Sequence, residues 1–154
     1  MEIEERAVQE KTLYVCVNNV GRSQMAEAFH NDIIPDTAES AGIAVDKPGG
    51  KVADWIGGAD YICQSMDELN LDISKNTRTQ FDVEMAKKFG RTVFLLQTDQ
   101  VPECLFDILD EKRLWWPMDD PRDITLERTR EIRDKIREDV EYLISKTVVV
   151  SEVP

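Results

Sequence analysis

Histidine is almost absent from this chain: His30 is the only one among 154 residues. A single imidazole excludes metal sites built on two or three histidines and leaves little material for a Cys–His catalytic pair. Cysteine is also sparse, with Cys16, Cys63 and Cys104 far apart and no Cys-x-x-Cys pair. An odd set of dispersed cysteines argues against a disulfide framework, so we expect free thiols, a reducing cytoplasm and no bound metal or cofactor.

Basic residues are outnumbered, because 19 Lys and Arg face 31 Asp and Glu and leave a formal net charge of −12. A surface of that sign repels phosphate backbones and anionic lipids, so we expect no nucleic acid and no membrane as partner. The sequence has no run of about 18 apolar residues that could cross a bilayer. Its acidic start, MEIEERAVQEK, lacks the apolar stretch of a secretory signal, which again favours the cytoplasm.

Apolar residues make up 42% of the chain, enough for the core of one domain of this length. We expect residues 1–154 to form a single domain, with residues 1–10 as a flexible, charged extension.

Strand-like and helix-like segments alternate along the chain. The almost wholly apolar run TLYVCV, residues 12–17, is typical of a strand buried on both faces of a parallel sheet. Further strands are predicted at 37–43, 92–96 and 113–116, and helices at 23–33, 51–69, 81–89 and 126–145. The pattern predicts an α/β three-layer sandwich, with a central, mainly parallel four-stranded sheet and helices on both faces. The tail after residue 145 is either a last edge strand or a loose end.

The first strand leads into a helix through eight residues that we call the Cys16 loop: Cys16-Val17-Asn18-Asn19-Val20-Gly21-Arg22-Ser23. Open α/β sheets bind ligands beyond the carboxyl ends of their strands, and a helix start offers unpaired N–H groups and a positive dipole end. Arg22 can add two forked hydrogen bonds to a tetrahedral oxyanion. Residues 17–23 are therefore predicted to bind an oxyanion.

Cys16 opens this loop, where a helix N-terminus and a nearby cation favour the thiolate over the thiol. Ser23 can donate a hydrogen bond to the sulfur and cap the helix, while Asn19 can brace the loop and accept left-handed backbone angles. Gly21 allows an unusual backbone conformation. These features predict a nucleophilic thiolate without a histidine base. The alternative is a buried, inert cysteine followed by an ordinary turn.

The stretch C-V-N-N-V-G-R-S-Q-M-A-E-A-F, residues 16–29, resembles the signature of the low-molecular-weight protein tyrosine phosphatase superfamily. Its R-S-Q-M-A-E run is most similar to the arsenate reductases of that fold, since the phosphatases more often carry proline in place of Gln24. The resemblance extends over roughly residues 12–145, with three more similar stretches in order at 39–42, 71–74 and 116–121.

The resemblance implies a catalytic trio. Cys16 is the nucleophile, Arg22 clamps the oxyanion, and Asp120 is the general acid that protonates the leaving oxygen. Such an acid typically contributes about 10²–10⁴-fold to the rate. Asp119 is the alternative acid, since a shift of one residue in the loop would exchange the two, and the pair can also be an Asx turn before Pro121.

Two reactions fit this implied site, on an arsenate or a phosphate-containing substrate. In the reductase form, a second thiol reduces the arsenic adduct on Cys16, which implies an external reductant, either thioredoxin-like or a small thiol. The three-cysteine relay of thioredoxin-coupled arsenate reductases is incomplete here, because Leu96 stands in the place of the first partner. Cys104 is then the possible redox thiol, and Cys63 is expected in the core.

In the phosphatase form, Cys16 attacks an aryl or acyl phosphate and water hydrolyses the cysteinyl-phosphate. Family phosphatases carry an aromatic residue after the Asp-Pro pair, where this chain has Arg122. The aromatic wall is then expected from Trp55, Trp115 or Trp116.

Two functions of another class stay open. One is a thiol–disulfide redox protein that pairs Cys16 with Cys104 or Cys63, and the other is a non-catalytic anion-binding module. His30, late in the first helix, is expected to be solvated or to cap the helix C-terminus.

Overall fold

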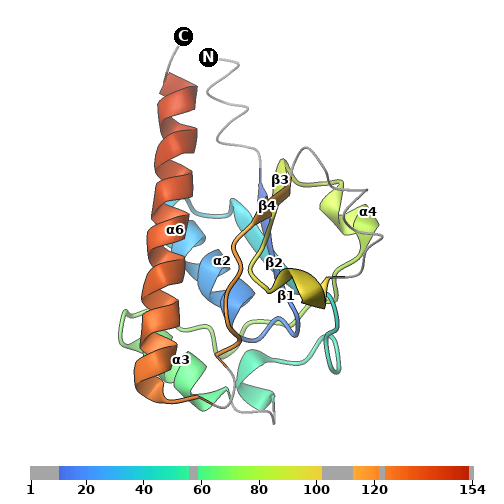
Figure 1. Ribbon diagram of the computed structural model, residues 1–154, viewed down its shortest axis with the longest axis vertical. Coiled ribbons are helices and arrows are strands. Elements are labelled where there is room, and N and C mark those ends of the chain that lie inside the picture. Colours follow the sequence, from blue (N-terminus) through green and yellow to red (C-terminus); the bar gives the residue numbers. More distant parts are fainter. Residues whose placement is uncertain (1–10, 56–58, 102–112, 122–123, 153–154) are drawn as a thin grey trace.

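A four-stranded parallel sheet lies at the centre of the computed structural model, which describes residues 11–55, 59–101, 113–121 and 124–152 (Figure 1). The strand order is β2-β1-β3-β4, and each neighbouring pair runs parallel. The strands are β1 (Thr12–Cys16), β2 (Ala38–Gly42), β3 (Arg91–Phe94) and β4 (Arg113–Trp115). The helices are α2 (Arg22–Ile33), α3 (Asp60–Asp67), α4 (Val83–Ala86) and α6 (Leu126–Glu152), with short 3-10 turns η1 (Val52–Asp54) and η2 (Thr98–Gln100).

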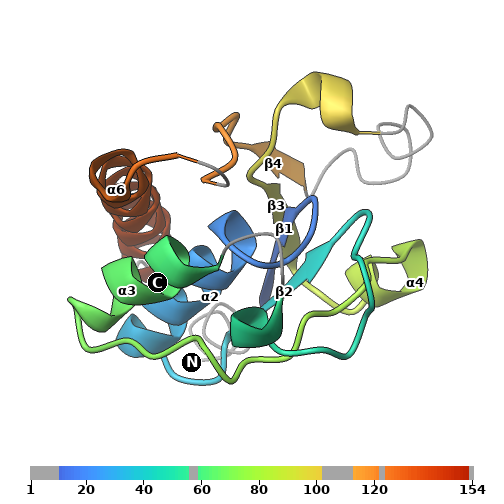
Figure 2. The same cartoon turned by 90° about the horizontal axis from the view of Figure 1, so that it is seen from below.

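The sheet separates two apolar clusters, because successive side chains of a strand point to opposite faces. Every residue of β1 is buried. Tyr14 joins the cluster of α2, α3 and α6, whereas Leu13 and Val15 join the cluster that includes Ala86 of α4. Viewed from below, α2, α3 and α6 cover one face of the sheet and α4 covers the other (Figure 2). The predicted α/β three-layer sandwich is confirmed.

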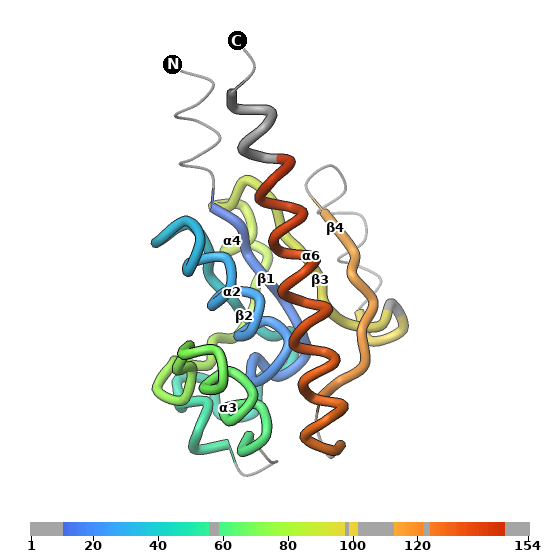
Figure 3. Tube along the Cα trace, turned by 90° about the vertical axis from the view of Figure 1, so that its left-hand side faces the viewer, coloured from blue at the N-terminus to red at the C-terminus, as the bar shows by residue number. Residues whose placement is uncertain are grey.

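Helix α6 runs along the whole molecule beside α2 (Figure 3). Its apolar stripe, Ile132, Ile136, Val140 and Ile144, is buried in the core. On the α3 side, Arg133 donates to the carbonyl of Ser65 at 2.8 Å and to Glu68 at 2.7 Å. The helix continues through Glu152, so the predicted end at residue 145 is wrong, as are both the edge strand and the loose end expected after it.

Two other predicted helices are shorter than expected. Residues 51–69 form η1 and then α3 instead of one helix, and residues 81–89 contain only the four-residue α4. Gly90, which follows that segment, donates its N–H to the carbonyl of Lys11, next to β1. Local periodicity does not report such long-range contacts, which compete with the helix for the same backbone groups.

Three predictions fall outside the described residues: the flexible extension at 1–10, Cys104 and Arg122. Among the residues that the structure describes, no helix is long and apolar enough to cross a membrane.

His30 is neither solvated nor a free capping group, because its side chain is buried and its Nδ1 lies 2.7 Å from the hydroxyl of Tyr14. Burial lowers the pKa of His30 to about 4, with a smaller contribution from the positive charge of Arg91. The helix stripe was assigned from apolar residues alone, which hides a histidine that serves as a polar core residue.

This burial makes the stability of the fold depend on pH. In the unfolded chain His30 regains a pKa of about 6.5, so between pH 6.5 and 4 the unfolded state binds more protons than the folded one. The stabilisation is complete above pH 6.5 and is lost as the pH falls toward 4, by up to about 3 kcal/mol. Urea unfolding should show a steeper loss between pH 7 and pH 4 for the wild type than for His30→Gln. Parallel curves for the two proteins would contradict the assignment.

Candidate active site

The Cys16 loop lies at the carboxyl end of β1, between the sheet and the start of α2 (Figure 2). Cys16 pairs in register with Gly42 at the end of the neighbouring β2. A Cβ on Gly42 would lie 2.5 Å from the carbonyl oxygen of Val17 and 2.8 Å from the backbone nitrogen of Asn19. The loop can therefore fold against β2 only because Gly42 has no side chain.

Ser23 connects the loop to the thiol. Its hydroxyl oxygen lies 3.0 Å from the sulfur of Cys16 and accepts a hydrogen bond from Asn19 Nδ2 at 2.7 Å. Because that oxygen already accepts from Asn19, its own hydrogen is available for the sulfur. The prediction that Ser23 caps α2 is wrong. Ser23 is the second residue of the helix, and the N-cap is Gly21, where no side chain forms a capping hydrogen bond.

Asn19 is the brace of the loop and has a left-handed backbone with φ of 55°. Its side-chain nitrogen also donates to the hydroxyl of Ser40 at 3.0 Å. Its side-chain oxygen accepts from the backbone of Thr79 at 2.8 Å and from Gln24 Nε2 at 3.2 Å. One buried amide thus ties the loop to β2, to α2 and to the segment after α3.

Arg22 opens α2 and is 2% exposed, so its guanidinium is held inside the protein rather than in solvent. Its Nη1 donates to the carbonyl of Met118 at 3.1 Å, and its Nη2 lies 3.8 Å from a carboxylate oxygen of Asp120. The structure brings the predicted nucleophile, clamp and acid together in one pocket, which is lined by Cys16, Asn18, Val20, Gly21, Arg22, Trp55, Ile62 and Asp120.

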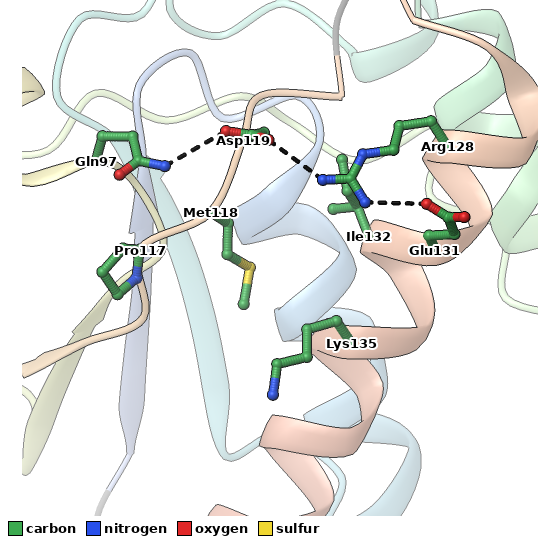
Figure 4. A pocket seen from close by; sticks show the side chains of 8 residues that line it. All are labelled: Gln97, Pro117, Met118, Asp119, Arg128, Glu131, Ile132 and Lys135. Atoms are coloured by element: carbon green, nitrogen blue, oxygen red, sulfur yellow. Dashed lines mark hydrogen bonds and ion pairs between the residues drawn. The ribbon is translucent and has the colours of Figure 1, made fainter.

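The two adjacent aspartates point to different places. Asp120 lines the Cys16 pocket. Asp119 forms an ion pair with Arg128 at 3.2 Å and accepts from Gln97 at 3.4 Å, in a separate pocket against α6 (Figure 4). The geometry therefore offers Asp120, not Asp119, to a ligand beside Cys16.

The tryptophans also separate. Trp55 lines the Cys16 pocket, whereas Trp115 stacks on Phe94 with ring centroids 4.6 Å apart and Trp116 lies 6.0 Å from Tyr14. Of the three candidates for an aromatic wall, Trp55 is the one beside the thiol.

A short segment after α3, residues 76–78, contacts the Cys16 loop and the start of α2, and no sequence pattern predicted this contact. Gln24 donates to the carbonyl of Thr77 at 3.2 Å and accepts from Asn76 at 3.1 Å. Arg78, buried like Arg22, donates to the carbonyl and side chain of Asn18. No local motif marks these residues, because their partners lie more than 50 positions away in the sequence.

Cys63 is a poor redox candidate. Burial raises the pKa of its thiol to about 11, and the nearby carboxylates Asp67, Asp72 and Asp60 contribute to that rise. Its thiolate is therefore scarce at neutral pH, and a thiol reacts as its thiolate. In the described part of the chain, no group of three or more His, Cys, Asp or Glu residues could hold a metal ion.

Gly21 allows the segment of residues 117–121, which we call the acid loop, to approach the Cys16 loop. The φ of Gly21 is −107°, so left-handed freedom is not the reason for a glycine there. A Cβ at this position would lie 2.7 Å from Pro121 Cγ and 3.2 Å from Ile62 Cδ1. The missing side chain lets Pro121, and with it Asp120, close over the Cys16 loop.

Gly21→Ala should lower the free energy of unfolding by about 1–3 kcal/mol, because the new methyl group overpacks against Pro121. Gly50→Ala is the matched control, since a Cβ there meets nothing closer than 3.4 Å. Chemical denaturation of both variants and the wild type measures the difference. Equal losses for the two variants would show that the contact with Pro121 is not limiting.

Comparison with known proteins gives a consistent result. The family model described as low molecular weight phosphotyrosine protein phosphatase matches residues 11–152. An arsenate reductase of Bacillus cereus is 31% identical over 132 residues, covering 83% of this chain and 90% of that protein. A solved arsenate reductase in the phosphate binding state is 26% identical, with a TM-score of 0.71, and covers 90% of this chain and 98% of its own. Vibrio vulnificus Wzb in complex with benzylphosphonate, at 21% identity, has the same fold with a TM-score of 0.74 over 90% and 99% of the two chains.

These relatives confirm the predicted resemblance, including its arsenate reductase branch, and the predicted class of activity. The protein is an enzyme that processes oxyanions through a cysteine, and both reductase and phosphatase chemistry fit it. The chain belongs to the low molecular weight phosphotyrosine protein phosphatase family.

Proposed function

We propose that this enzyme reduces arsenate, with Cys16 as the nucleophile, Arg22 as the oxyanion clamp and Asp120 as the general acid. One observation carries the proposal: the thiol, the buried guanidinium and the carboxylate line the same pocket at the carboxyl end of β1. The sequence identity of 31% and 26% to two arsenate reductases supports arsenate over phosphate esters as the substrate.

The first step is an attack on arsenic. The backbone N–H groups of residues 17–23 and the guanidinium of Arg22 hold the tetrahedral oxyanion. The Cys16 thiolate forms an S–As bond while one As–O bond breaks, and Asp120 supplies the proton with which that oxygen leaves as water. Ser23 stabilises the thiolate before the attack, from 3.0 Å.

The second step needs two electrons from thiols. A thiolate attacks the sulfur of Cys16, the electron pair of the S–As bond passes to arsenic, and arsenite leaves with a disulfide on Cys16. A further thiol reduces that disulfide and restores Cys16. We infer an external thiol donor, thioredoxin-like or small, because Leu96 is buried in the core and the thiol of Cys63 stays protonated. Cys104 stays a candidate for the second thiol.

Phosphatase activity is the second candidate, and Trp55 favours it. An indole beside the thiol offers a flat apolar surface to an aryl phosphate. After Cys16 attacks phosphorus and the alcohol leaves, water would hydrolyse the cysteinyl-phosphate with Asp120 as the base.

We also infer that the whole chain works as one domain in the cytoplasm, with residues 1–10 as a charged extension. Free thiols at Cys16 and Cys63 support a reducing compartment.

Two assays in parallel test the proposal. Wild-type protein should reduce arsenate with a thiol donor, and Cys16→Ser should lose the activity by roughly 10⁴-fold or more, because a hydroxyl does not replace the thiolate. Hydrolysis of p-nitrophenyl phosphate, measured with the same proteins, shows whether water can resolve the covalent adduct on Cys16 in place of a thiol. We expect Cys104→Ser to retain reduction with glutathione as donor, and loss of activity would instead assign the second thiol to Cys104.

The proposal is overturned if the wild type lacks both activities and neither phosphate nor arsenate protects Cys16 from alkylation. Rapid ester hydrolysis without any arsenate reduction would favour the phosphatase function instead.

Asp120→Asn should slow turnover by about 10²–10⁴-fold, because the amide cannot protonate the leaving oxygen. With phosphate esters the loss should be larger for phenyl phosphate than for p-nitrophenyl phosphate, whose leaving group needs less help from an acid. Asp119→Asn is the matched control and should lose only the exposed ion pair with Arg128. If Asp119→Asn showed the larger, leaving-group-dependent loss, the two roles would be exchanged.

A further inference from the structure

Arg78 contacts the Cys16 loop from the side of the segment that follows α3. Its Nε and Nη2 donate to the carbonyl of Asn18 at 3.3 and 3.1 Å, and Nη2 also donates to the Asn18 side-chain oxygen at 2.6 Å. Its Nη1 donates to the carbonyl of Asp46 at 2.7 Å. The forked contact fixes the peptide that joins Asn18 to Asn19, in the middle of the oxyanion-binding loop.

All of these hydrogen-bond acceptors are neutral. Within the described residues, no carboxylate lies close enough to form an ion pair with Arg78, although the side chain is only 2% exposed. A buried cation whose hydrogen-bond partners are all neutral is stabilised by an anion that lies nearby. Burial lowers the pKa of Arg78, while the charges of Asp46 and Cys16 raise it. The negative charge of a Cys16 thiolate therefore helps to keep Arg78 charged.

Trp55 shields this cation. The guanidinium carbon of Arg78 lies 5.8 Å from the centroid of the indole ring, which also lines the Cys16 pocket. An aromatic face beside a guanidinium is attractive and keeps water away, so the charge is screened less than it would be in solvent.

We propose that Arg78 is a positioning residue of the oxyanion site, which holds the Asn18 peptide in its binding geometry and supplies a second positive charge to the Cys16 thiolate and its oxyanion. This role deepens the proposed function and rests on it. Arg22 contacts the acid loop inside the pocket, whereas Arg78 acts through Asn18. The two arginines together give the site a local positive potential in a protein of net charge −12.

The test measures the reactivity of each cysteine by peptide mass spectrometry after iodoacetamide treatment at pH 6 and pH 9, with and without inorganic phosphate. In Arg78→Gln, the pH 6 rate at Cys16, relative to its pH 9 rate, should fall about tenfold. The phosphate concentration that protects Cys16 should rise about tenfold. Arg78→Lys retains the charge but loses the fork, so it should retain most of the pH 6 reactivity and still need more phosphate.

Two controls separate this role from a general loss of structure. Cys63 in the same molecule should react equally in all variants. Arg133→Gln removes another buried arginine, whose partners are Ser65, Glu68 and Asp134, and should leave Cys16 reactivity and phosphate protection at wild-type values.

Wild-type reactivity and protection in Arg78→Gln would overturn the role of Arg78 alone, because the wild type still binds phosphate. A wild type that lacks both activities, and in which neither phosphate nor arsenate protects Cys16, would overturn the proposed function itself. If Arg78→Gln does not fold, Arg78→Lys decides: about tenfold weaker phosphate protection supports the role, and unchanged protection refutes it.

Discussion

The site depends on the hydrogen bonds of one group, the side-chain amide of Asn19. From a left-handed backbone position it donates to Ser23 and Ser40 and accepts from Thr79. Each bond reaches a different element, so the turn after β1 cannot relax without breaking contacts to β2, to α2 and to the segment after α3. Buried polar networks of this kind specify one geometry, because a partly satisfied network is costly. The hydroxyl that faces the sulfur of Cys16 is oriented by this amide.

Two missing side chains make room for that geometry. Gly42 lets the loop fold against the end of β2, and Gly21 lets Pro121 close over it. The second contact explains how Asp120, which is far from Cys16 in the sequence, comes to line the same pocket. Arg22 strengthens the same closure, since it binds the carbonyl of Met118 and lies beside Asp120. Arg22 thus places a buried positive charge in the pocket of a protein whose net charge is −12.

Local patterns predicted the strands and the loop between β1 and α2 well. A strand buried on both faces must be almost wholly apolar, so TLYVC could be recognised without any tertiary information. The position of Cys16 followed from the chain passing directly from that strand into a helix. Other predictions failed where the conformation or burial of a residue depends on a partner that is distant in the sequence. His30 satisfies Tyr14 inside the core, and residues 51–69 do not form one continuous helix.

The sequence by itself determined the parallel α/β architecture, the Cys16 loop and the chemical class, because each depends on residue types at short spacings. Tertiary structure alone placed Asp120 instead of Asp119 in the Cys16 pocket, placed Trp55 there instead of the other two tryptophans, and brought Arg78 to the loop. The physical reason is that a side chain acts on whatever lies within a few ångströms of it. Those neighbours come from segments whose separation along the chain carries no signal.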